Sequence, residues 1–173
     1  MKKATLLMAI ITLPVAFAAT FGSGDQIVNQ DIKPGTYRSS GSTCIWQRLK
    51  GFSGNLEDII ASEISQGSAV VTIKKSDKGF TSSGCATWTD KLSPVTKSKT
   101  APFGGGTFIV NLDIAPGTWS AKGETCIYQR LSGFGGTLDE VIASDIKQGR
   151  AVVSIKATDK GFKSSGCGTF TKL

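Results

Sequence analysis

Short runs of apolar and β-branched residues, separated by glycine and proline, recur along the chain and predict β-strands. The clearest alternation is Thr43–Leu49, where Cys44, Trp46 and Arg48 point to one side of the strand and the residues between them to the other. A proline–glycine pair at Pro34 is typical of the tight turns that join strands. Further strands are expected at Gln26–Ile32, Thr36–Arg38, Ala69–Ile73, Ala86–Thr89 and Phe108–Ile114.

One segment fits two patterns. Apolar residues in Leu56–Ile64 fall at helical spacing, and Thr137–Glu140 resembles a helix capping box. The same stretch also fits a hairpin, with Ile59–Ile64 turning through Ser65–Gly67 into Ala69–Ile73. We favour the hairpin because a sheet edge in a small domain needs a partner strand. A single short helix in each repeat remains the alternative.

The second half of the chain repeats the first. Thr43-Cys44-Ile45 corresponds to Thr125-Cys126-Ile127, and well over half of the aligned positions are identical. Between the copies, residues 93–102 combine proline, small hydroxyl residues and lysine, which is typical of an exposed, semi-flexible linker. The sequence therefore predicts an all-β protein of two tandem, small β-sandwich or barrel-like domains, 19–92 and 103–173.

The N-terminal residues have the layout of a secretory signal peptide. Two lysines precede the apolar stretch Leu6–Phe17, and the small residues around Ala18 suit cleavage after it. The alternative, a membrane anchor, would need a longer apolar run. We expect residues 1–18 to be removed and the mature protein to be secreted or to lie in the periplasm or cell envelope, without a transmembrane span.

Composition removes several classes of function. The chain has no histidine, which excludes histidine-based catalytic triads and the commonest metal ligand. Its formal net charge is +7, but basic and acidic side chains nearly balance within each copy, unlike a nucleic-acid-binding protein. We expect no metal, no cofactor and no nucleic-acid partner, and a monomer in solution.

The four cysteines divide equally between the copies, at Cys44 and Cys85 and at Cys126 and Cys167. In an exported protein, paired cysteines at equivalent positions are expected to form disulfides within each repeat. Cross-repeat pairing and free thiols are the alternatives. A disulfide closing a loop of this length contributes about 4 kcal/mol in the chain-entropy model.

Carboxylates are the remaining candidates for catalysis. Three acidic positions recur in both copies: Asp31/Asp113, Asp58/Glu140 and Asp77/Asp159. A glycosidase needs two carboxyl groups facing a shared cleft. These acids lie beside turns, where aspartate commonly accepts hydrogen bonds from nearby backbone amides, and we expect that structural role.

Aromatic and arginine residues recur as well and are the candidate binding residues. They are Tyr37, Trp46 and Arg48 in the first copy, and Trp119, Tyr128 and Arg130 in the second. Exposed aromatic side chains beside arginine would suit a face that binds sugar or protein. The alternative is packing in the core, which is favoured for Trp46, while Arg48 could emerge at the rim.

The motifs Asp31–Tyr37, Cys44–Leu49 and Ser82–Trp88, repeated in the second copy, resemble a small module of bacterial secreted proteins and lipoproteins. The resemblance covers nearly the whole mature chain except the linker. The resemblance implies an all-β accessory domain of envelope proteins. It implies no particular ligand or catalytic residue. Members of this family often follow a lipid-modified cysteine or another domain, and we expect neither in this protein.

These observations favour a non-enzymatic, exported binding or structural module that acts at the cell envelope or outside the cell. Two linked copies would raise avidity for a repeated ligand, such as a cell-surface glycan, or for an envelope protein. One alternative is a secreted inhibitor of a protease or cell-wall hydrolase that uses the loop Lys74–Gly84. A carboxylate-based hydrolase is the third hypothesis.

Overall fold

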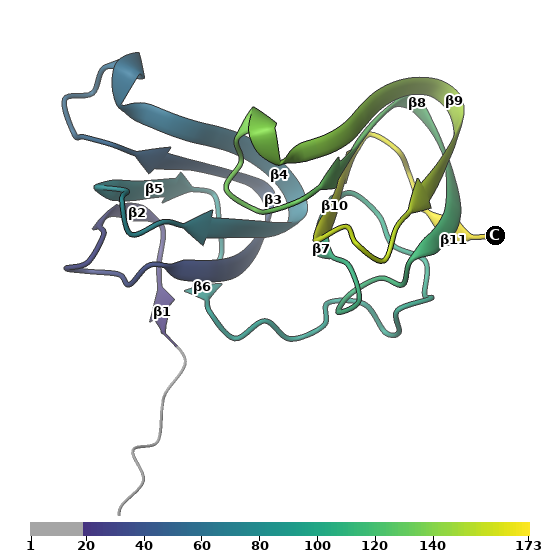
Figure 1. Cartoon of the computed structure of the whole chain (residues 1–173), viewed down its shortest axis with the longest axis horizontal. Helices are drawn as coiled ribbons and strands as arrows, with labels where there is room; N and C mark the ends of the chain where they lie inside the picture. Colours follow the sequence, from purple (N-terminus) through teal and green to yellow (C-terminus); the bar gives the residue numbers. More distant parts are fainter. Residues whose placement is uncertain (1–18) are drawn as a thin grey trace, which may run out of the picture.

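A computed structural model describes residues 19–173, and in this part of the chain the protein is all-β (Figure 1). The two repeats lie side by side, each as one small β-domain. The signal peptide expected at residues 1–18 lies outside the described residues. The prediction of two tandem all-β domains is confirmed.

Repeat 1 is organised around one long central strand, β3, which pairs with β4, β5 and β6. Strand β2 extends the sheet beyond β5, and β1 pairs with β6. The strands are β1 (Thr20–Phe21), β2 (Gly24–Ile27), β3 (Gly35–Leu49), β4 (Ile59–Ile73), β5 (Gly79–Ser83) and β6 (Trp88–Thr89).

Repeat 2 has the same plan around strand β8, which pairs with β9, β10 and β11. Strand β7 extends the sheet beyond β10. An isolated bridge between Phe103 and Phe170 takes the place of the β1–β6 pair. The strands are β7 (Gly106–Ile109), β8 (Gly117–Leu131), β9 (Val141–Ile155), β10 (Gly161–Ser165) and β11 (Thr171–Lys172).

The prediction of a turn at Ser65–Gly67 is wrong. Strand β4 runs without interruption for 15 residues, and β3 runs equally far beside it. A register shift between Gly41 and Cys44 and a positive φ of 92° at Gly67 let the long hairpin bend without ending. Each repeat therefore has one long, bent hairpin where the sequence predicted shorter strands.

The segment that fitted two patterns contains both a strand and a short helix. One turn of 3₁₀ helix, η1 (Leu56–Asp58) or η2 (Leu138–Glu140), precedes each long strand. The predicted capping box does not form, because the carboxylate of Glu140 accepts a hydrogen bond from the amide of Gly135. The strand expected at Gln26–Ile32 ends at Ile27. At that point the Asp31 carboxylate accepts a hydrogen bond from the Ile27 amide, which closes a turn.

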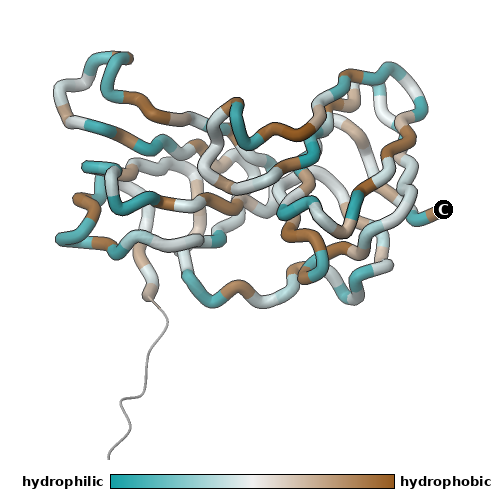
Figure 2. The backbone as a smooth tube through the Cα atoms, viewed as in Figure 1, coloured by the Kyte–Doolittle hydropathy of each residue, from teal (hydrophilic) through white to brown (hydrophobic). Residues whose placement is uncertain are grey.

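Each repeat has its own disulfide and its own core. The pairs are Cys44–Cys85 and Cys126–Cys167, as expected. The buried apolar residues form two separate clusters, and each lies within a single repeat. Figure 2 shows hydrophobic and hydrophilic positions interspersed along the strands, as expected of sheets with one face inward.

Candidate functional site

Five of the six candidate binding residues are buried and the sixth, Arg130, is partly exposed, which corrects the expectation of an exposed aromatic binding face. All four aromatic side chains, Tyr37, Trp46, Trp119 and Tyr128, are 7% exposed or less. They occupy inward positions of β3 and β8, where alternation places them on the core side. Trp46 stacks on Phe80 of its own repeat. The rings therefore pack in the core, as the core-packing alternative for Trp46 proposed, and Tyr128 also borders the surface.

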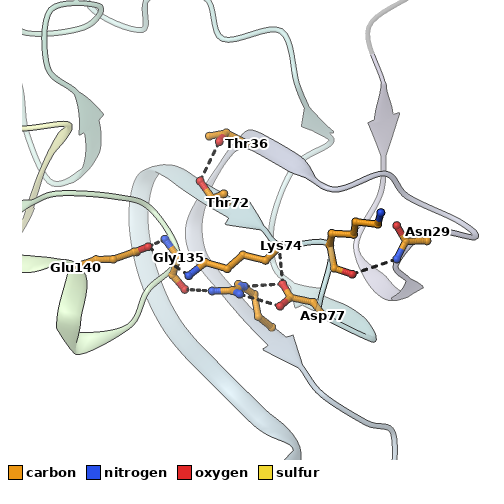
Figure 3. Close-up of polar contacts among 9 residues, drawn as sticks. Asn29, Thr36, Thr72, Lys74, Asp77, Gly135 and Glu140 are labelled. Atoms are coloured by element: carbon orange, nitrogen blue, oxygen red, sulfur yellow. Dashed lines mark hydrogen bonds and ion pairs between the residues drawn. The ribbon is translucent and has the colours of Figure 1, made fainter.

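Arg48 is buried with them and forms an ion pair with Asp77. Its Nε and Nη2 atoms donate to the two carboxylate oxygens at 2.7 and 2.8 Å (Figure 3). The Asp77 carboxylate also accepts a hydrogen bond from the backbone amide of Lys74 at 2.8 Å, and this bond closes the turn before β5. The segment Lys74–Gly84, expected as a projecting loop, thus consists of this turn and a strand within the sheet.

Arg130 and Asp159 repeat this arrangement in the second copy, with donor–acceptor distances of 2.6 and 2.8 Å. Burial by itself would raise the pKa of Asp159. Hydrogen bonds from Arg130 and from the backbone amide of Lys156 outweigh that effect and hold the pKa below its usual value. The ion pair in turn raises the pKa of Arg130.

We expect acid to destabilise the protein partly through Asp159. Since its pKa is lower in the folded than in the unfolded state, its contribution to stability is present above about pH 4 and is lost as pH falls through the folded pKa. Thermal unfolding followed by circular dichroism should show a smaller decline in Tm below that pH for Asp159→Asn than for the wild type. An unchanged decline would contradict this assignment.

The hollow beside Arg48 in repeat 1 is filled by a loop of repeat 2. The third donor of Arg48, Nη1, donates to the carbonyl of Gly135 at 2.7 Å. Figure 3 labels Gly135, which lies on the opposite side of this guanidinium from Asp77. The backbone amide of Thr72 donates to the carbonyl of Phe134 at 2.8 Å. Gly136, with φ at 75°, lies so close to Trp46 that an added Cβ would stand 2.6 Å from the indole. We call residues 133–137 the docking loop.

Further polar contacts join the repeats on both sides of the docking loop. Arg38 forms a buried ion pair with Asp113, with an Nη1–Oδ1 distance of 3.0 Å. Lys163 lies 3.2 Å from the Glu63 carboxylate. A parallel bridge between Ser68 and Gly106 connects the two sheets. The repeats therefore have separate cores but are docked to each other through backbone and charged groups.

The segment 93–102 between the repeats is mostly exposed and is nevertheless held in place. The amide of Val95 donates to the Asp113 carboxylate at 3.1 Å, and the amide of Ala115 donates to the carbonyl of Lys99 at 2.6 Å. These bonds tie the segment to the same turn that receives Arg38.

The matching hollow in repeat 2 is open. It has a volume of about 260 Å³ and we call it the repeat-2 hollow. It is lined by Tyr128, Arg130, Ala143, Ser144, Asp145, Val152, Val153 and Ser154. These residues correspond by position to the residues around the docking loop in repeat 1.

Exposure of matching residues measures the difference between the two hollows. Val70 in repeat 1 is 1% exposed, whereas its counterpart Val152 is 47% exposed. The side chain of Arg48 is 1% exposed and that of Arg130 is 14% exposed. In residues 19–173, no group accepts a hydrogen bond from Nη1 of Arg130. The second copy thus leaves open the surface that the first copy uses for docking.

A second cavity, of about 210 Å³, lies between the repeats. Its lining includes Glu63, Gln129, Glu140 and Lys163. Two of these charged groups already pair with each other across the boundary, and Glu140 lies 3.7 Å from Lys74. This cavity therefore belongs to the interface between the repeats.

The recurring carboxylates have structural partners. Asp58 accepts the amide and hydroxyl of Ser53, and these bonds lower its pKa. Asp113 accepts the amide of Ile109 in addition to Arg38. Within residues 19–173, no group of three or more acidic or cysteine side chains could hold a metal ion. The same part of the chain contains no helix long and apolar enough to cross a membrane.

Comparison with known proteins agrees with this architecture. Residues 18–89 and 100–171 each match the family described as "Rv1352-like extracellular domain". The chain belongs to this family. The family and the disulfides place the protein outside the cytoplasm, secreted or at the cell envelope. No curated protein and no solved structure matches the chain.

Sequence reasoning missed the docking loop and the open hollow. The available signal lies in positions where the two copies differ. Gly135 replaces Ser53, and Arg150 replaces Ser68, and one member of each pair touches the interface. At these two positions, the difference between the copies coincides with the place where they meet.

Proposed function

We propose that this family member is a non-catalytic, extracellular binding module that holds a partner in the repeat-2 hollow. One observation carries the proposal: the equivalent hollow in repeat 1 binds a polypeptide loop through a guanidinium, a backbone amide and a buried aromatic ring. The open copy offers Arg130, Tyr128 and an exposed Val152 in the same positions.

The surroundings of the acidic residues support a role without catalysis. Asp77 and Asp159 are each bound by an arginine and a backbone amide, and Asp31 and Asp113 each accept an amide of their own turn. Carboxylates engaged in this way stabilise turns and are poorly placed to exchange protons with a substrate.

The docked repeats offer one open hollow and not two equal binding faces. Repeat 2 covers the hollow of repeat 1, so the two copies present different surfaces to a partner. The avidity expected from two identical binding faces is therefore replaced in this proposal by one preorganised site.

We expect the exported protein to be retained on isolated envelope or cell-wall fractions, and Val152→Glu to abolish retention. A charge at this exposed position blocks the hollow without entering the core. Retention is measured by co-sedimentation. Ile146→Glu is the matched control, because Ile146 is exposed on the same strand and outside the hollow. Absence of retention, or equal retention of both variants, would contradict the proposal.

A further inference from the structure

We propose that the occupant of the repeat-2 hollow is a loop of another protein that carries two adjacent glycines, bound as the docking loop is bound in repeat 1. This inference rests on the proposed function and names the chemistry of the partner. Each contact of the docking loop has a counterpart in repeat 2.

The first counterpart is the guanidinium. Arg48 uses Nε and Nη2 for Asp77 and has Nη1 left for the carbonyl of Gly135. Arg130 uses the same two atoms for Asp159, which fixes the guanidinium plane in the same way. Its Nη1 therefore points to where a partner's carbonyl oxygen would lie.

The second counterpart is a backbone amide. Thr72, which donates to the carbonyl of Phe134, is paired in register with Thr36. Ser154 is paired with Thr118 in the same register, and the two hydroxyl groups are again in contact, at 3.3 Å. The amide of Ser154 is thus set to donate a hydrogen bond to a second carbonyl of a partner segment, as the amide of Thr72 does in repeat 1.

The need for glycine follows from the space available. A Cβ on Gly135 would lie 2.9 Å from Nη1 of Arg48, and a Cβ on Gly136 would lie 2.6 Å from Trp46. Gly136 also has a positive φ, which side chains disfavour. Because Arg130 and Tyr128 occupy the corresponding places, a partner loop bound in the same conformation needs glycine at both positions.

A second copy of this chain fits the hollow poorly. In repeat 1, residues 51–55 correspond to the docking loop, and they have Ser53 at the position of Gly135. Arg150 stands where Ser68 meets the backbone of Gly106, and an arginine there would obstruct the approach. The chain therefore disfavours head-to-tail growth, which an open interface of this type would otherwise permit.

The test uses a cyclised peptide of residues 131–141, which contains the docking loop, titrated into the ¹⁵N-labelled full chain. Since repeat 1 is already occupied, we expect amide shifts at Ala143, Val152 and Ser154 and none at Thr72. The control peptide has alanine in place of the second glycine. Val152→Glu in the protein should weaken binding of the parent peptide about tenfold or more.

The outcomes separate this inference from the proposed function. Absence of shifts at Ser154, or equal shifts with the alanine peptide, overturns the inference. If envelope retention still depends on Val152 in that case, the hollow binds another ligand, such as a glycan, and the proposed function stands. Sedimentation that shows self-association of the wild type but not of Val152→Glu identifies a second copy as the occupant and also overturns the inference.

Discussion

Replacing both Cys126 and Cys167 with alanine should lower the free energy of unfolding of repeat 2 by about 4 kcal/mol, because the disulfide closes a long loop in the unfolded chain. The total free energy of unfolding of a folded domain is about 5 to 15 kcal/mol. The repeat should therefore become marginally stable, and protein made in a reducing cytoplasm should aggregate. Urea denaturation followed by tryptophan fluorescence and proteolysis measures the loss.

The matched control is the same double substitution of Cys44 and Cys85 in repeat 1, since both disulfides close loops with a sequence separation of 41. Because each apolar core lies within one repeat, either variant should leave the core of the other repeat folded. A loss below about 1 kcal/mol in both variants would mean that the cores suffice without the disulfides.

Arg48→Met should destabilise the protein by about 3 to 5 kcal/mol, because it leaves the Asp77 carboxylate buried without its partner. It also removes the donor that holds the carbonyl of Gly135 and so loosens the docking loop. Urea denaturation measures the first effect. Hydrogen exchange at the amide of Thr72, which is bonded to the docking loop, measures the second.

Arg130→Met provides the comparison within the same chain. Its ion pair with Asp159 has the same geometry, but the arginine side chain is more exposed and holds no loop. Water can therefore solvate the remaining carboxylate in part, and the loss of stability should be smaller. Exchange at Thr72 should remain slow in this variant. Equal losses in the two variants would show that docking of the repeats adds nothing to the Arg48 site.

The contrast between the two arginines shows that the two copies present different surfaces. A heterologous interface uses different surfaces of the two copies, so it leaves one surface of each kind unused. In this chain the unused hollow belongs to repeat 2, and the unused loop belongs to repeat 1, where Phe52 is exposed. In our proposal, Ser53 and Arg150 keep these two surfaces from meeting between molecules.

The sequence by itself determined the duplication, the all-β class and the disulfide pairing. These features depend on short-range patterns: alternation in Thr43–Leu49, the proline–glycine turns, and cysteines at equivalent places in an exported chain. It also indicated that recurring acids such as Asp77 close turns, because that role depends on neighbours a few residues away.

Only the tertiary structure decided where strands continue and which of the two equivalent hollows stays open. The bend in β4 is possible because β3 bends beside it, which no local pattern in Ser65–Gly67 reveals. Val70 and Val152 stand in the same local motif, yet one is buried and the other exposed. Their environments differ because the docking loop, distant in the chain, covers only the first, and burial depends on such non-local contacts.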